Sequence, residues 1–111
     1  MCLFSLGASA GYDRIITDYL YSAGLLDDRM EDIGVADILG IFLDQKGETV
    51  VTSKQIQHLA ISLEKLKQIP RRICLAYYEE KAEGILLASR MGLISELITD
   101  SYTALEIIRK N

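Results

Sequence analysis

Hydrophobic and polar residues follow one another along the chain in short blocks that predict alternating strands and helices. The apolar run Cys2–Leu6 predicts a strand, and the small residues Gly7–Gly11 predict the loop after it. Helical spacing of apolar residues predicts a helix over Tyr12–Tyr21, which ends near Gly24. A second, mostly acidic helix is expected over Leu26–Ile33.

The middle of the chain predicts a local antiparallel pair. Ala36–Leu43 is expected to form one strand, and Glu48–Thr52 is expected to return beside it. Between them, Asp44–Gly47 has the composition of a hairpin turn, with a glycine available for positive φ.

From His58 onward the pattern changes to strand, helix, strand, helix, strand, helix. Polar caps, one proline and one continuous apolar run carry this prediction. The expected elements are a strand at His58–Ile61, a helix at Leu63–Ile69 capped by Ser62 and ended by Pro70, a strand at Ile73–Tyr78, a helix at Glu79–Met91, a strand at Leu93–Thr99, and a helix at Ser101–Lys110 capped by Asp100.

This alternation predicts an α/β fold with a parallel sheet, helices on both faces and an added β-hairpin. Only three parallel strands are expected, at Cys2–Leu6, Ile73–Tyr78 and Leu93–Thr99, whereas such sheets usually have five or six. The deficit suggests an incomplete sheet. Ligands of parallel sheets bind beyond the carboxyl ends of the strands, which directs attention to Tyr77, Tyr78, Lys81 and Asp100.

Composition narrows the class of protein. The 111 residues carry a formal charge of -4, which argues against a nucleic-acid-binding surface in this chain. We expect no membrane helix and no signal peptide. Cys2 and Cys74 have no second cysteine at metal-ligand spacing and His58 is the only histidine, so we expect reduced cysteines, a cytoplasmic protein and no metal site.

Several segments in order resemble SorC-type transcriptional regulators. Gly34–Gly47, with Ala-Asp-Ile followed by Phe42, Asp44 and a glycine turn, is similar to one stretch of that family. Ile61–Pro70 resembles its helix that runs into Ile-Pro. Ile73–Ala76, Glu79–Ala82 and Leu97–Asp100 resemble the final strand, the lysine turn and the Thr-Asp strand end of its sugar-binding domain.

The resemblance implies a Rossmann-like effector-binding domain that binds phosphorylated sugars or related metabolites. Residues 1–111 would then be its C-terminal portion, with no DNA-binding domain in this chain. It also implies a homo-oligomer that needs no cofactor and has no catalytic residues. Asp37 matches the acidic residue that holds sugar hydroxyls in the family, and Lys81 matches its phosphate-contacting lysine.

Each candidate also has a structural interpretation. Lys81 is placed to contact an anion at a helix start, but it could instead pair with a neighbouring glutamate. Asp37 could be a strand-end carboxylate that accepts backbone amides. Tyr77 and Tyr78 stand where the family has Gly-Gly, so they either obstruct a phosphate or stack on a sugar ring.

Two other functions stay open. The chain could be a vestigial or protein-interaction fragment that dimerises through an exposed sheet edge. It could also be a sugar-phosphate isomerase-like enzyme on the related fold, although no acid/base pair or nucleophile constellation is visible in the sequence.

Overall fold

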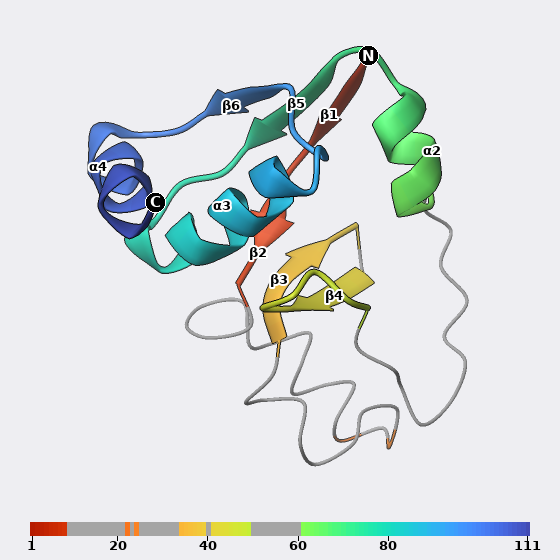
Figure 1. The fold of residues 1–111 in the computed structure, drawn as a ribbon, viewed down its shortest axis with the longest axis horizontal. Coiled ribbons are helices and arrows are strands. Elements are labelled where there is room, and N and C mark those ends of the chain that lie inside the picture. Colours follow the sequence, from red (N-terminus) through yellow and green to blue (C-terminus); the bar gives the residue numbers. More distant parts are fainter. Residues whose placement is uncertain (9–21, 23, 25–33, 40, 50–60) are drawn as a thin grey trace.

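A parallel three-stranded sheet forms one half of the fold. The computed structural model describes residues 1–8, 22, 24, 34–39, 41–49 and 61–111. Within these residues, β1 (Cys2–Phe4), β5 (Arg72–Leu75) and β6 (Glu96–Ile98) lie in the order β1-β5-β6 with every pairing parallel (Figure 1). The three predicted parallel strands and the α/β fold class are confirmed.

A smaller antiparallel sheet lies beside the first. It contains β2 (Leu6–Gly7), β3 (Gly34–Ile38) and β4 (Ile41–Asp44) in the order β2-β3-β4. The prediction of one strand over Ala36–Leu43 is therefore wrong, because the chain reverses at Leu39, whose φ is 55°. The predicted turn at Asp44–Gly47 is confirmed by hydrogen bonds from the Lys46 and Glu48 amides to Asp44 Oδ1.

The returning strand is only partly visible. Thr49 makes one antiparallel bridge to Leu43, and residues 50–52 lie outside the described residues. The predicted helices at Tyr12–Tyr21 and Leu26–Ile33 fall wholly outside them, as does most of the predicted strand at His58–Ile61.

Polar caps begin two of the helices where the sequence predicts them. The Ser62 hydroxyl accepts the Lys65 amide at 3.3 Å at the start of α2 (Leu63–Gln68). The Asp100 carboxylate accepts the Thr103 amide at 2.7 Å at the start of α4 (Ser101–Lys110). The predicted helix at Glu79–Met91 consists of a 3-10 turn, η3 (Glu79–Lys81), followed by α3 (Ala82–Arg90).

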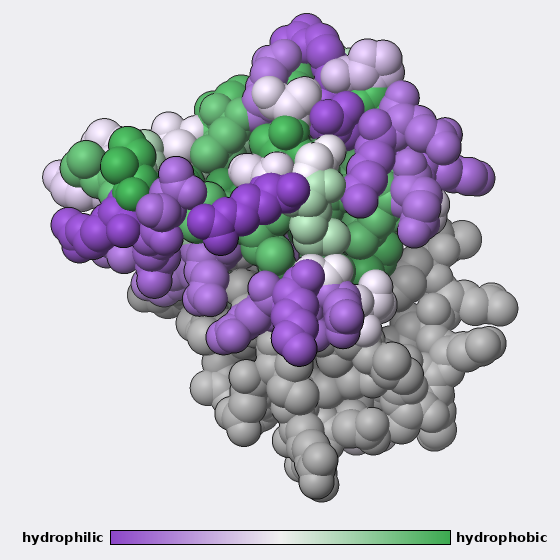
Figure 2. Space-filling model, in the orientation of Figure 1, coloured by the Kyte–Doolittle hydropathy of each residue, from purple (hydrophilic) through white to green (hydrophobic). Residues whose placement is uncertain are grey.

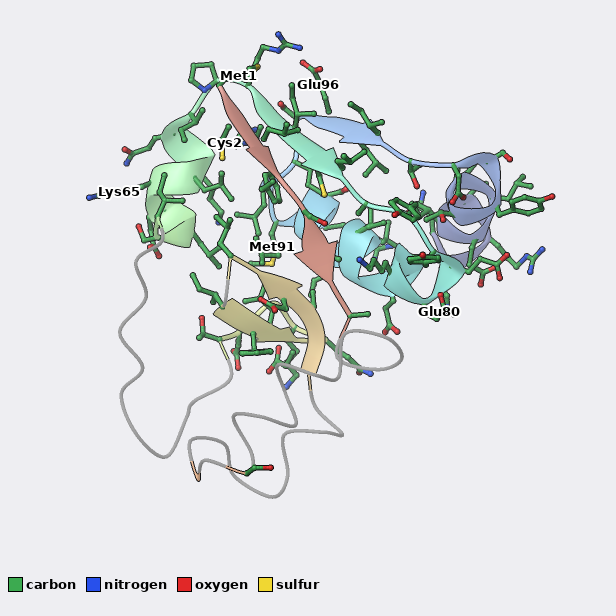
Figure 3. The ribbon with its side chains drawn as sticks, turned by 180° about the vertical axis from the view of Figure 1, so that it is seen from behind. Met1, Cys2, Lys65, Glu80, Met91 and Glu96 are labelled. Atoms are coloured by element: carbon green, nitrogen blue, oxygen red, sulfur yellow. The ribbon has the colours of Figure 1, made fainter. Side chains whose placement is uncertain are left out.

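α3 joins the two halves of the molecule. It packs against β2 and β3 of the small sheet and against α4, while α2 lies at the other end of the parallel sheet (Figure 1). Beyond its end, Met91 points toward β3 and β4 (Figure 3). The core between these elements is built from one aromatic residue, Phe4, and from aliphatic or small residues, among them Leu6, Ile38, Leu43, Leu66, Cys74, Ala76, Ile85, Ala88 and Leu93.

Alternation along the strands gives the parallel sheet two different faces. Phe4, Cys74 and Ala76 point into the core and are buried. On the opposite face, Leu3, Leu75 and Ile98 are 63%, 45% and 54% exposed. The described helices thus leave much of this face accessible, although Ile73 on it is buried. The second helical layer expected from the sequence is not among the described residues.

Further apolar side chains reach the surface on α4. Tyr102, Leu105 and Ile108 are exposed at a spacing of three residues, and Figure 2 shows hydrophobic atoms at the surface over this helix. None of the helices in the described ranges is long and apolar enough to cross a membrane.

Candidate functional site

The loops that follow β5 and β6 begin side by side. Leu75 pairs with Ile98 at the ends of the two strands, and the Ala76 amide donates to the Ile98 carbonyl at 3.2 Å, which extends the pairing by one residue. Because both strands point the same way, the segments Ala76–Lys81 and Thr99–Thr103 meet at the carboxyl edge of the sheet. This is the edge where parallel sheets bind ligands.

Tyr78 adopts a backbone conformation that L-residues rarely use. Its φ is 90° and its ψ is 134°, and Leu39 is the other described non-glycine residue with positive φ. The tyrosine therefore follows a path that suits glycine, the residue that the resemblance leads us to expect here. The Lys81 amide donates to the Tyr78 carbonyl at 3.0 Å and closes the 3-10 turn.

The two tyrosines and Lys81 form one cluster at this turn. The rings of Tyr77 and Tyr78 are half-exposed, with centroids 4.6 Å apart and planes tilted by 46°. Lys81 Nζ lies 6.0 Å from the centroid of the Tyr78 ring, at the outer limit of a cation–π contact. The cluster thus offers two aromatic faces beside one ammonium group.

Asp100 caps α4 and lies at the same edge as the turn. Its carboxylate accepts a hydrogen bond from the backbone N–H of Thr103 at 2.7 Å. Hydrogen bonding to Thr103 is the main cause that holds the pKa of the Asp100 carboxyl below its ordinary value of 3.8. The carboxylate is therefore ionised at neutral pH and caps the first turn of α4.

A small cleft opens between the turn and the start of α4. Its volume is about 260 Å³, and it is lined by Tyr78, Glu79, Glu80, Asp100, Tyr102 and Thr103. Figure 3 shows Glu80 at this end of the molecule, close to α4. Carboxylates accept hydrogen bonds from hydroxyl groups, and aromatic rings pack on the apolar face of a sugar, so the lining suits a polyhydroxylated ligand.

Three of the four predicted ligand-binding residues lie at this edge. Tyr77, Tyr78 and Lys81 are brought together, and Tyr78 also lines the cleft. Asp37 lies on β3 of the other sheet, half-buried between Gly7 of β2 and Phe42 of β4, and it is not among the residues that line the cleft.

The sequence did not single out Tyr102 or Thr103 as lining residues. Both belong to the first turn of α4, and the cleft brings them opposite Tyr78. The signal for them was indirect: Asp100 follows a parallel strand at the carboxyl edge, so the first turn of its helix also lies there.

Cys74 lies on β5, before the turn, in surroundings that disfavour its reactive thiolate form. Its side chain is fully buried, and burial raises the pKa of the thiol to about 11, an effect that the nearby Lys81 ammonium opposes. Cys2 and Cys74 are both free, as the sequence predicts. The described residues contain no cluster of histidine, cysteine or acidic side chains that could hold a metal ion.

An α/β fold with a cleft at the carboxyl edge of its parallel sheet is the architecture of a ligand-binding domain. The family model described as "Putative sugar-binding domain" matches residues 1–109. The chain belongs to this sugar-binding domain family of SorC-type transcriptional regulators, which confirms the family suggested by the sequence motifs.

Individual relatives agree with this assignment. The transcriptional regulator LsrR of Escherichia coli (strain K12) is 46% identical over 77 residues, which cover 68% of this chain and 24% of that protein. The chain therefore spans about a quarter of the length of the curated relatives it matches. LsrR of Enterobacter sp. (strain 638) is 40% identical over 76 residues, which cover 67% of this chain and 23% of that protein.

Solved structures share the fold over almost the whole chain. The full-length sorbitol operon regulator SorC of Klebsiella pneumoniae has a TM-score of 0.75 at 30% identity, with 95% of this chain and 34% of that chain covered. A transcriptional regulator from Streptococcus pneumoniae TIGR4 has a TM-score of 0.74 at 29% identity, with 97% and 41% covered.

Proposed function

We propose that this chain is part of the effector-binding domain of a transcriptional regulator and binds a phosphorylated sugar at the carboxyl edge of β5 and β6. The observation that carries the proposal is the cluster of Tyr77, Tyr78 and Lys81 at that edge, in a chain of the sugar-binding domain family. Rings, carboxylates and an ammonium group are the partners that a sugar phosphate needs.

Lys81 is the residue that we assign to the phosphate. Glu79, Glu80 and Asp100 line the neighbouring cleft and disfavour an anion there, so the phosphate is expected on the Lys81 side of the turn. The sugar then lies toward the tyrosine rings and the acidic lining, where its hydroxyl groups find acceptors. The role of Asp37 in holding hydroxyl groups stays a prediction from the family resemblance.

The same proposal covers partners and location. The effector is bound without being converted, because the relatives are named as regulators and not as enzymes. The net charge of -4 makes DNA contact by this chain itself unfavourable. We expect the protein to act in the cytoplasm, where a regulator meets its operator, and to form a homo-oligomer.

Ligand-induced thermal stabilisation tests the binding. Glucose 6-phosphate, fructose 6-phosphate and ribose 5-phosphate, each paired with its unphosphorylated sugar and with inorganic phosphate, are added to the purified chain. A ligand that binds only the folded state raises the melting temperature as its concentration rises above its Kd. At least one sugar phosphate is expected to stabilise the chain more than its unphosphorylated partner.

Matched variants locate the site. K81M is expected to remove the preference for the phosphorylated form, whereas K65M, on the exposed surface of α2, leaves it unchanged. Loss of both tyrosine rings in Y77A/Y78A weakens binding of either form. No stabilisation by any sugar would contradict the proposal, and product formation during incubation would favour the isomerase-like alternative.

A further inference from the structure

One side of α4 carries an apolar stripe that the described part of the chain leaves uncovered. Tyr102, Leu105 and Ile108, here called the α4 stripe, are 72%, 61% and 71% exposed. The opposite side of the helix carries Thr103, which is buried, and Ile107, which packs against the core. The fold therefore needs only one side of α4, and three large side chains are left in water on the other side.

The stripe lies where a second molecule can reach it. Figure 1 shows α4 at the outer end of the fold, beyond the end of β6, and Figure 2 shows hydrophobic atoms at the surface over this helix. The main contacts of α4 are with α3 and η3. A partner can therefore dock on the stripe without displacing any of these elements.

The sequence of α4 is arranged symmetrically about Leu105. Tyr102 and Ile108 stand three residues before and after it, and Ser101 and Arg109 stand four residues before and after it. Two copies of the helix that pack antiparallel about a twofold axis at Leu105 therefore place each Leu105 against its counterpart and each Tyr102 against an Ile108. The stripe is thus self-complementary, as the interface of a twofold dimer must be.

The charges at the two ends of α4 favour the same antiparallel arrangement. The start of the helix is acidic, since Asp100 caps it and Glu79 and Glu80 line the cleft there. The last turn is basic, and Arg109 in it stays 77% exposed although its Nη1 lies 3.1 Å from Glu106 Oε2. Antiparallel packing brings the basic end of one copy to the acidic start of the other and opposes the two helix dipoles, whereas parallel packing brings like charges together.

The exposed area sets the strength of the association. Three apolar side chains of this size offer on the order of 400 Å² per copy, about half of the roughly 800 Å² that each partner buries in a standard interface. Polar residues around the stripe bring the buried area toward the lower limit for a specific interface. We therefore expect a weak dimer that dissociates on dilution.

We propose that the α4 stripe is a dimerisation surface, which a second copy of this chain covers by antiparallel packing of the two α4 helices about Leu105. The inference rests on the proposed function in one respect, because it names a surface for the homo-oligomer expected there. Tyr102 belongs both to the stripe and to the lining of the sugar cleft, so dimerisation places the second copy beside the ligand edge.

Sedimentation equilibrium of the purified chain, without any sugar, measures the association. Between roughly 5 and 500 µM the wild-type chain is expected to shift from monomer to dimer as its concentration rises. L105E places two carboxylates against each other at the twofold axis and is expected to stay monomeric throughout. L3E is the matched control, because Leu3 is equally exposed but lies on the face of the parallel sheet, and it is expected to dimerise like the wild type.

Cysteine cross-linking tests the direction of the two helices. In a C2S background, which removes the partly exposed native thiol, L105C is expected to form a disulfide-linked dimer under mild oxidation, because residue 105 meets itself at the axis. Y102C alone is expected to stay uncrosslinked. Y102C mixed with I108C is expected to give a cross-linked heterodimer, because antiparallel packing sets these two positions against each other.

A wild-type chain that stays monomeric at every concentration overturns the inference, as does a dimer that L105E leaves intact or that L3E abolishes. Cross-linking of Y102C with itself shows parallel packing and overturns the antiparallel arrangement. Neither measurement contains a sugar, so failure of the α4 dimer and failure of sugar binding are recorded separately.

Discussion

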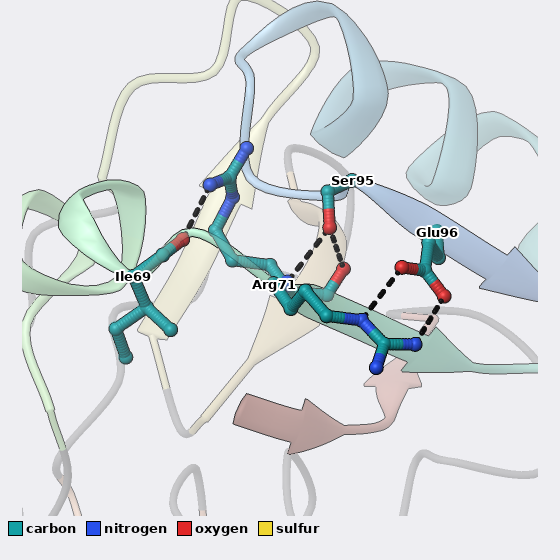
Figure 4. A network of polar contacts seen from close by, with 5 residues as sticks. Ile69, Arg71, Ser95 and Glu96 are labelled. Carbon is teal, nitrogen blue, oxygen red and sulfur yellow. Dashed lines mark hydrogen bonds and ion pairs between the residues drawn. The ribbon is translucent and has the colours of Figure 1, made fainter. Parts of the chain in front are cut away.

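Arg71 and Glu96 form a two-point ion pair between the approach to β5 and the first residue of β6. Arg71 Nε lies 2.9 Å from Glu96 Oε1, and Arg71 Nη2 lies 3.0 Å from Oε2 (Figure 4). The Ser95 hydroxyl adds a second link, because it accepts the Arg72 amide at 2.7 Å and donates to the Arg72 carbonyl at 3.1 Å. Two strands of only three and four residues thus gain polar contacts at their amino ends.

The Arg71–Glu96 pair predicts a small loss of stability in acid. The hydrogen bond from Arg71 lowers the pKa of the Glu96 carboxyl below 4.5, so the pair stabilises the fold above that pH and loses its effect as the pH falls through the lowered pKa. Melting temperatures of the wild type and E96Q, measured at a series of pH values between about 3 and 7, test this prediction. The difference in melting temperature is expected to be small, because both side chains are about half-exposed, and to close in acid. A constant difference would contradict the prediction.

Y78G is expected to stabilise the chain. Glycine adopts φ 90° without strain, so the free energy of unfolding is expected to rise by about 1 kcal/mol in denaturant titrations. Y77G is the matched control, because Tyr77 is equally exposed but is not among the positive-φ residues. Glycine there only adds freedom to the unfolded chain and is expected to destabilise it by about 0.5–1 kcal/mol. The same sign for both variants would argue against strain at Tyr78.

Gly47 is expected to tolerate alanine less well than Gly92. Both have positive φ, at 80° and 75°. A Cβ atom at Gly47 would lie 2.7 Å from Met91 Sδ, whereas a Cβ atom at Gly92 meets nothing within 4 Å. Denaturant unfolding is expected to show a loss of about 1 kcal/mol for G92A from backbone strain alone. G47A is expected to lose about 2 kcal/mol, because Met91 must also move. Equal losses would show that Met91 adapts freely.

The buried thiol of Cys74 predicts a decline of stability in alkali. Its pKa is about 11 in the folded chain against 9.0 for an ordinary thiol, so the folded state binds the proton more tightly. Stability is therefore present below pH 9 and is lost as the pH rises toward 11. C74A is expected to flatten this decline relative to the wild type.

In native protein at about pH 8, Ellman's reagent is expected to spare the buried Cys74 thiol until the chain unfolds.

Much of the fold follows from local sequence signals. Ser62 and Asp100 cap helices where the sequence predicts caps, since an N-cap requires only a side chain and an amide three residues apart. The continuous apolar run at Ile73–Tyr78 predicts a buried strand, and β5 (Arg72–Leu75) covers the first part of that run. Because Tyr77 and Tyr78 end the predicted strand and Lys81 follows it, their gathering at one edge was also predictable.

Other features depend on contacts that single-sequence patterns do not contain. The reversal at Leu39 divides an apolar run that looks like one strand, and Leu39 itself carries no turn chemistry. The cleft brings Tyr78 beside Asp100, which lies 22 positions further along the chain. Tyr78 also follows the positive-φ path that glycine adopts freely, at an energetic cost that single-sequence patterns do not reveal.

Ser5 alone separates β1 from β2, so a single residue carries the chain from the parallel sheet into the antiparallel one. Unfolding of either sheet is therefore expected to displace the strand of the other sheet that adjoins Ser5. Melting followed by probes placed in the two layers is therefore expected to give superimposable curves, so that loss of the small sheet dismantles the ligand edge as well.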